Sequence, residues 1–162
     1  MATIRDAIEE DLPRIVELLA QLSLDGPREE LGPPLPETYR AAFRDVLADA
    51  KQRQLVLEDG GRIVGLTTLI IVPNLSHQGR PWAQVENVIV DKEQRGAGLG
   101  EQLMRYAIDL AREAGCYKLV LTSNKGRADA HRFYSRIGFP RRMRDFATIF
   151  NTAALTTVQN PP

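Results

Sequence analysis

Apolar and polar positions recur along the chain with two different periods, and each period is typical of one kind of element. Apolar residues return at helical spacing in the ranges 11–22, 37–50, 98–114 and 129–137. Shorter runs rich in aliphatic and β-branched residues separate them, at 3–7, 54–58, 62–72, 82–90, 117–122 and 144–150. The order is therefore β-α-α-β-β-β-α-β-α-β, which predicts a mixed α/β fold.

The lengths of the connections predict how the strands pair. Asp59-Gly60-Gly61 separates two strand runs and is a strong hairpin signal, and the next connection is also short, so these strands should be antiparallel. The run at 117–122 follows a helix, and such a crossover places it parallel to the run at 82–90. The segment 23–36 is rich in glycine and proline and should be a functional loop or a flexible connector. The tail 151–162 should be loose or paired at a sheet edge.

Local signals also predict how the first two helices begin and which faces they bury. Asp11 is expected to be the N-cap of the first helix, with Pro13 in the first turn, where a missing N–H costs nothing. The second helix should bury one stripe of apolar side chains. That stripe is Tyr39, Phe43, Val46, Leu47 and Ala50.

Composition narrows the class of protein. The 162 residues, 43% of them hydrophobic, predict a single domain over 1–162 with its own core. Lys plus Arg equals Asp plus Glu at 21 each, which argues against nucleic acid or an anionic membrane as partner. Apolar runs are too short to span a bilayer, and no signal peptide is recognisable. One cysteine, Cys116, and two histidines argue against a disulfide framework or a metal site. We expect a metal-free cytoplasmic protein.

The most informative stretch lies between the strand run that ends at Asp91 and the helix that follows. It reads Arg95-Gly96-Ala97-Gly98-Leu99-Gly100. Glycines remove side chains where the chain turns, so several backbone N–H groups can converge on one point. The start of the next helix adds unpaired N–H groups and the positive end of its dipole. This combination predicts an anion site, and phosphate is its usual occupant.

Two common nucleotide motifs do not fit this stretch. No Lys-Ser or Lys-Thr pair follows the glycines, which excludes a P-loop, and the spacing G-x-G-x-G differs from the dinucleotide fingerprint G-x-G-x-x-G. The stretch instead resembles R/Q-x-x-G-x-G/A, the pyrophosphate loop of the GNAT superfamily of N-acetyltransferases. Every position of that motif is filled.

A second motif supports this resemblance. Leu121-Thr122-Ser123-Asn124 ends a strand run, and the following helix contains Phe133-Tyr134, then three residues, then Gly138-Phe139. This is similar to the GNAT element that lies along the pantetheine arm of the cofactor. The resemblance implies a GNAT fold, which is α/β with a mixed central sheet. Its N-terminal half is antiparallel, a parallel pair of strands lies at the cofactor site, and helices cover both faces.

The resemblance further implies acetyl-CoA as co-substrate, with no metal. The pyrophosphate would be bound by Arg95, Gly96, Ala97, Gly98, Leu99 and Gly100. The parallel strands would splay, so that pantetheine pairs with the strand edge and the thioester oxygen meets a backbone N–H of Val88, Ile89 or Val90. Asn124 would contact the pantetheine arm or, alternatively, serve as an ordinary strand-end cap.

Two side chains are expected to carry protons. Tyr134 is the predicted general acid, which would protonate the leaving thiolate, although a core aromatic is the alternative. Glu86 is the predicted general base for the amine, although it could instead be a solvent-facing strand residue. Asn87 should then point to the opposite face, unless a bulge reverses it.

The predicted activity is direct transfer of an acetyl group from the thioester to a primary amine, most simply that of a small molecule such as an amino sugar. The acceptor should lie along 23–36, 73–82 and the C-terminal segment. Two alternatives are a protein or peptide amine as acceptor, and a non-catalytic CoA-binding sensor. Many members of this fold pair, so a homodimer is expected.

Overall fold

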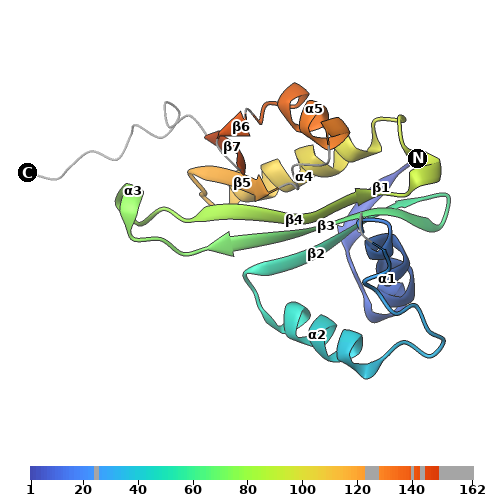
Figure 1. Cartoon of the computed structure of the whole chain (residues 1–162). Helices are drawn as coiled ribbons and strands as arrows, with labels where there is room; N and C mark the ends of the chain where they lie inside the picture. Colours follow the sequence, from blue (N-terminus) through green and yellow to red (C-terminus); the bar gives the residue numbers. More distant parts are fainter. Residues whose placement is uncertain (24–25, 123–127, 140, 143–144, 150–162) are drawn as a thin grey trace, which may run out of the picture.

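The computed structural model describes residues 1–23, 26–122, 128–139, 141–142 and 145–149. These residues form a mixed sheet with the strand order β1-β2-β3-β4-β5-β7-β6, and helices cover both of its faces (Figure 1). The strands are β1 (Thr3–Asp6), β2 (Gln52–Asp59), β3 (Arg62–Val72), β4 (Trp82–Val90), β5 (Lys118–Thr122), β6 (Arg141–Arg142) and β7 (Asp145–Ile149). The helices are α1 (Leu12–Ala20), α2 (Glu37–Ala48), α3 (Ser76–Gly79), α4 (Leu99–Glu113) and α5 (Ala128–Arg136), with 3-10 turns η1 (Glu9–Asp11) and η2 (Lys92–Gln94).

Strand pairing follows the prediction. β1 to β4 form an antiparallel series, and β4 pairs with β5 in parallel after the crossover through α4. Gly60 and Gly61 form the two-residue hairpin turn between β2 and β3, both with positive φ. The short strand β6 was not predicted, and the tail 151–162 lies outside the described residues.

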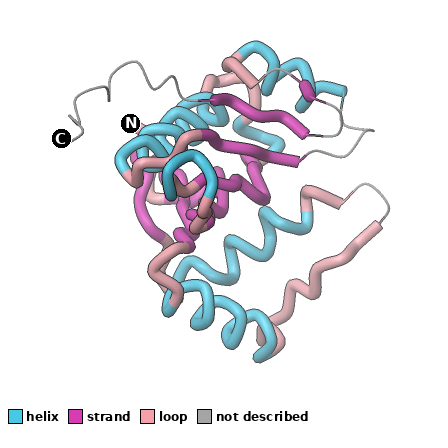
Figure 2. Tube along the Cα trace, turned by 90° about the vertical axis from the view of Figure 1, so that its left-hand side faces the viewer, coloured by secondary structure: helices cyan, strands magenta, loops and turns pink. Residues whose placement is uncertain are grey.

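The helices divide into two layers. Figure 2 shows α1, α2 and the loop that joins them on one side of the sheet, and α4 and α5 on the other. On the α4 side, buried side chains of the central strands pack against Met104, Ala107 and Ala111. On the α1 side, Ile15 and Val16 pack against alternate residues of the same strands. None of the described helices is long and apolar enough to cross a bilayer.

β4 contains a bulge that changes which residues face each layer. Thr68 pairs with Glu86, and Leu66 pairs with Ile89, so two residues of β4 lie opposite the single residue between them on β3. Asn87 takes a left-handed φ of 54° there, which asparagine tolerates better than most residues. As a result Val88 packs on the same side as Val85, three positions before it, instead of on the side of Glu86.

The first two helices follow the expectation in part. Asp11 is the N-cap residue of α1 and Pro13 lies in the first turn, as predicted. The Asp11 carboxylate, however, bonds no helix N–H, because it accepts the N–H of Ile8 and forms a bidentate pair with Arg5. On α2 the buried stripe is reduced to Phe43, with Tyr39 and Val46 partly buried, while Leu47, at 52%, and Ala50 are exposed. Only one row of α2 side chains reaches the sheet.

A buried ion pair joins α1 to the end of β4. Asp91 is 3% exposed, and its carboxylate accepts hydrogen bonds from Arg14 of α1 and from the N–H of Glu93 at 3.1 Å. Arg62 approaches the same oxygen as Arg14, at 3.4 Å. Burial alone would raise the pKa of Asp91, but the Glu93 N–H and the Arg14 guanidinium outweigh it, so the pKa is lowered.

Asp91→Asn keeps the shape of the side chain and removes its charge, so we expect it to destabilise the fold by about 2 kcal/mol at neutral pH. Because the folded-state pKa is lowered, this stabilisation is complete above the unfolded-state value of about 4 and is lost as the pH falls through the folded-state pKa. Urea unfolding of both proteins from pH 3 to 7 measures the difference. It should be constant above pH 5 and shrink below pH 4. A difference that does not change with pH would show that the charge contributes nothing.

Candidate active site

The glycine loop begins where β4 ends. Asp91 starts the turn η2, and the chain then turns at Gly96 and Gly98, whose φ angles are +88° and +78°. Gly98 is the N-cap of α4. A Cβ atom at either glycine would meet no other heavy atom within 4 Å, so these glycines serve the backbone conformation and not close packing. The space in front of the first turn of α4 is therefore open to an anion.

The third glycine of the motif has a different role. A Cβ atom on Gly100 would lie 3.4 Å from Cζ of Phe133, so the absence of a side chain lets α5 approach the first turn of α4. Phe133 in turn packs edge-on against Tyr134, with ring centroids 5.2 Å apart. The two predicted motifs are thus in contact with each other.

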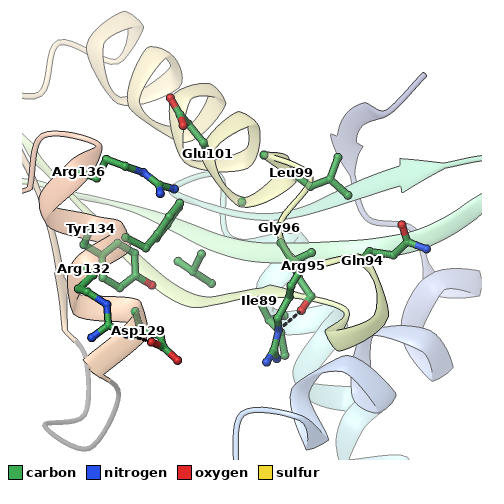
Figure 3. Close-up of a pocket in the computed structure, with 16 residues that line it drawn as sticks. Ile89, Gln94, Arg95, Gly96, Leu99, Glu101, Asp129, Arg132, Tyr134 and Arg136 are labelled. Atoms are coloured by element: carbon green, nitrogen blue, oxygen red, sulfur yellow. Dashed lines mark hydrogen bonds and ion pairs between the residues drawn. The ribbon is translucent and has the colours of Figure 1, made fainter.

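A cavity of about 480 Å³ lies between the end of β4, the glycine loop and α5 (Figure 3). Most of the residues predicted to bind the cofactor line it: Val88, Ile89, Val90, Arg95, Gly96, Gly98, Leu99, Gly100 and Tyr134. Ala97 belongs to the loop but does not line the cavity, and Asn124 lies outside the described residues. Arg95 is exposed, and its Nε–H donates to the carbonyl of Val90 at 3.1 Å.

One edge of β4 is available along this cavity. β4 and β5 pair from Ala83 with Leu119 to Val85 with Leu121, and the described pairing stops there. β4 continues to Val90, and its last residues line the cavity on their β5 side, where none of the described strands pairs with them. Backbone groups at such an edge can pair with the amides of an extended ligand.

Tyr134 is nearly buried and still reaches the cavity. Its side chain is 4% exposed, and its hydroxyl points into the gap between α5 and the end of β4 (Figure 3). The ring belongs to the core on the α4 side of the sheet, which fixes its position. A phenol held in this way can donate a proton at one place in the cavity.

Glu86 lies on the other face of the sheet. Its neighbour Val85 packs in the α4-side core, and Glu86 points to the α1 side, where Gln84 Nε2 donates to its carboxylate. It does not line the cavity, so the structure separates the two predicted proton carriers by the thickness of β4. The loop after α1 lies on the same side as Glu86. Leu35 is buried there, and the Tyr39 hydroxyl donates to Glu29 at 2.8 Å.

Several cavity residues were not predicted from sequence. They are Gln94, Glu101, Asp129, Ala130 and Arg136. Those on α5 follow helical spacing, so a helical projection from Tyr134 would have found them. Arg132 also lines the cavity; it is exposed and paired with Asp129 at the rim.

Comparison with known proteins agrees with this geometry. Residues 16–139 match the model of the acetyltransferase (GNAT) family. A glucosamine 6-phosphate N-acetyltransferase of Trypanosoma brucei brucei is 34% identical over 84% of this chain and 89% of its own. An aminoalkylphosphonate N-acetyltransferase of Salmonella typhimurium is 30% identical over 84% and 83%. A crystal structure of a transcriptional regulator from Bacillus halodurans superposes with a TM-score of 0.83 at 39% identity, over 86% of this chain and 93% of that one. The chain therefore belongs to the GNAT family of acetyltransferases.

Proposed function

We propose that this acetyltransferase binds acetyl-CoA in the cavity beside the glycine loop and passes the acetyl group directly to the primary amine of a small molecule. The observation that carries the proposal is the meeting of three features in one cavity. These are the glycine loop at the start of α4, the available edge of β4, and the nearly buried Tyr134.

Each feature has a defined part in the reaction. The N–H groups of the glycine loop and of the first turn of α4 bind the pyrophosphate. The edge from Val88 to Val90 pairs with the pantetheine amides, and one of its N–H groups stabilises the negative charge that develops on the thioester oxygen. Tyr134 protonates the departing thiolate. With Cys116 buried and its thiol pKa raised by burial, direct transfer is favoured over an acyl-enzyme.

The acceptor amine reaches the thioester from the α1 side of the sheet, which Glu86 faces. The Glu86 carboxylate can take a proton from the amine there. The names of two relatives specify small amines that carry a phosphate or phosphonate group. We therefore propose an amino sugar phosphate or an aminoalkylphosphonate as the class of acceptor.

Calorimetry with acetyl-CoA, followed by thiol release against a panel of amines, tests this function. The panel contains glucosamine 6-phosphate, 2-aminoethylphosphonate, their phosphorus-free analogues and a lysine peptide. Binding of acetyl-CoA together with thiol release in the presence of the phosphorus-containing amines would support the proposal. Thiol release with the peptide alone would indicate that the acceptor is a protein amine. Binding without any release would favour a CoA-binding sensor, and no binding would contradict the site. Light scattering of the same sample tests the expected homodimer.

A further inference from the structure

The α1 side of the sheet carries a row of polar side chains in register across three central strands. Gln54 of β2 pairs with Thr68 of β3, and Thr68 pairs with Glu86 of β4. Thr68 is 7% exposed, and its hydroxyl donates to Oε1 of Gln54 at 2.9 Å. Burying polar groups in a sheet is unfavourable unless they are paired, and the hydrogen bond between Thr68 and Gln54 provides such pairing here.

The carboxylate of Glu86 is held from one side only. Gln84 lies two residues earlier on β4, hence on the same face, and its Nε2 donates to Oε1 of Glu86. Within the described part of the chain, no hydrogen bond reaches Oε2 and no cation pairs with the carboxylate. Other carboxylates on this side differ in this respect, because Asp11 pairs with Arg5 and Asp91 with Arg14.

This difference matters for proton transfer. A carboxylate paired with arginine has its charge neutralised and its lone pairs occupied, which makes it a poor proton acceptor. A neutral amide donor fixes the orientation of Glu86 without neutralising it, and it leaves the second oxygen open.

We infer that Gln84 is a positioning residue that orients Glu86, so that Oε2 takes the proton of the acceptor amine. This inference rests on the proposed function. In the step, the amine nitrogen forms a bond to the acetyl carbon as the carbon–sulfur bond breaks. The amine proton goes to Glu86, and the thiolate receives a proton from Tyr134. Gln84 itself exchanges no proton.

The test is a double-mutant cycle with Glu86→Gln. Gln84→Met keeps the length of the side chain and removes the amide donor. We expect this substitution to lower kcat about 10-fold and to leave the Kd for acetyl-CoA unchanged within twofold. A general base contributes roughly 100-fold or more to the rate, and loss of its positioning removes a part of that contribution. In the Glu86→Gln background the same substitution should have no further effect on kcat, because the group that it positions is gone.

Gln54→Met is the matched control, because it breaks the contact with Thr68 at the other end of the row and leaves Glu86 held. It should change kcat less than twofold.

If thermal melting shows that Gln84→Met folds poorly, Gln84→Glu is the second variant. It replaces the amide donor by a side chain of the same size that carries the same charge as Glu86, and kcat should fall at least as far. The inference is overturned if Gln84→Met lowers kcat by the same factor in the wild-type and Glu86→Gln backgrounds, or if it does not lower kcat at all. A wild-type protein without turnover on any amine would instead overturn the proposed function.

Discussion

Replacement of Gly98 by Asp is expected to weaken acetyl-CoA binding by about 100- to 1,000-fold. The position has φ +78°, and a Cβ atom there would enter open space in front of α4. An added carboxylate would thus stand where the pyrophosphate is proposed to bind. Two like charges about 4 Å apart near a protein surface repel by about 4 kcal/mol, which corresponds to roughly 1,000-fold in affinity. Calorimetric titration with acetyl-CoA measures the change directly.

Loss of the fold cannot account for this expected result. Any side chain at φ +78° is strained, but Asp tolerates a left-handed backbone better than most side chains. The melting temperature should therefore stay close to that of the wild type. Gly98→Asn has the same shape without the charge and should lose much less affinity. Gly60→Asp places the same charge at a positive-φ glycine in the β2–β3 turn and should lose none. Equal affinity of Gly98→Asp and wild type would show that the pyrophosphate lies elsewhere.

The features that sequence predicted correctly are those decided by local chemistry. Gly96 and Gly98 take positive φ because the loop requires it, and Gly60-Gly61 closes a tight hairpin for the same reason. The parallel pairing of β4 with β5 follows from the helix between them. Tyr134 lines the cavity from a helix whose motif was recognisable, while its role in the reaction stays a prediction.

The features that were wrong or left open depend on contacts between distant segments. Leu47 has the spacing of a buried residue, yet it is 52% exposed, because burial depends on what packs against α2 and not on α2 alone. The bulge at Asn87 decides which face Val88 takes, and it is fixed by the register with β3, which sequence periodicity does not contain.

The position of Tyr134 leads to the second large expected effect. Tyr134→Phe removes the hydroxyl and keeps the ring that packs against Phe133, so the fold and the cavity walls should be preserved. General acids contribute about 100- to 10,000-fold to rate. Because a thiol has a pKa of about 8.5, its thiolate is a good leaving group even when proton transfer to it is incomplete. The expected fall in kcat therefore lies near the lower limit, about 100-fold.

The changes in kcat, kcat/KM and the Kd for acetyl-CoA distinguish a general acid from an aromatic residue that only packs. Loss of a proton donor that acts only as the thiolate departs lowers kcat and kcat/KM equally and leaves the Kd for acetyl-CoA within twofold. Loss of a packing residue would lower the melting temperature and weaken cofactor binding together. Tyr106→Phe on α4 is the control, because that half-buried ring packs against the same core and does not line the cavity. It should leave kcat unchanged. A wild-type kcat in Tyr134→Phe would remove Tyr134 as the acid, and the thiolate would then leave unprotonated.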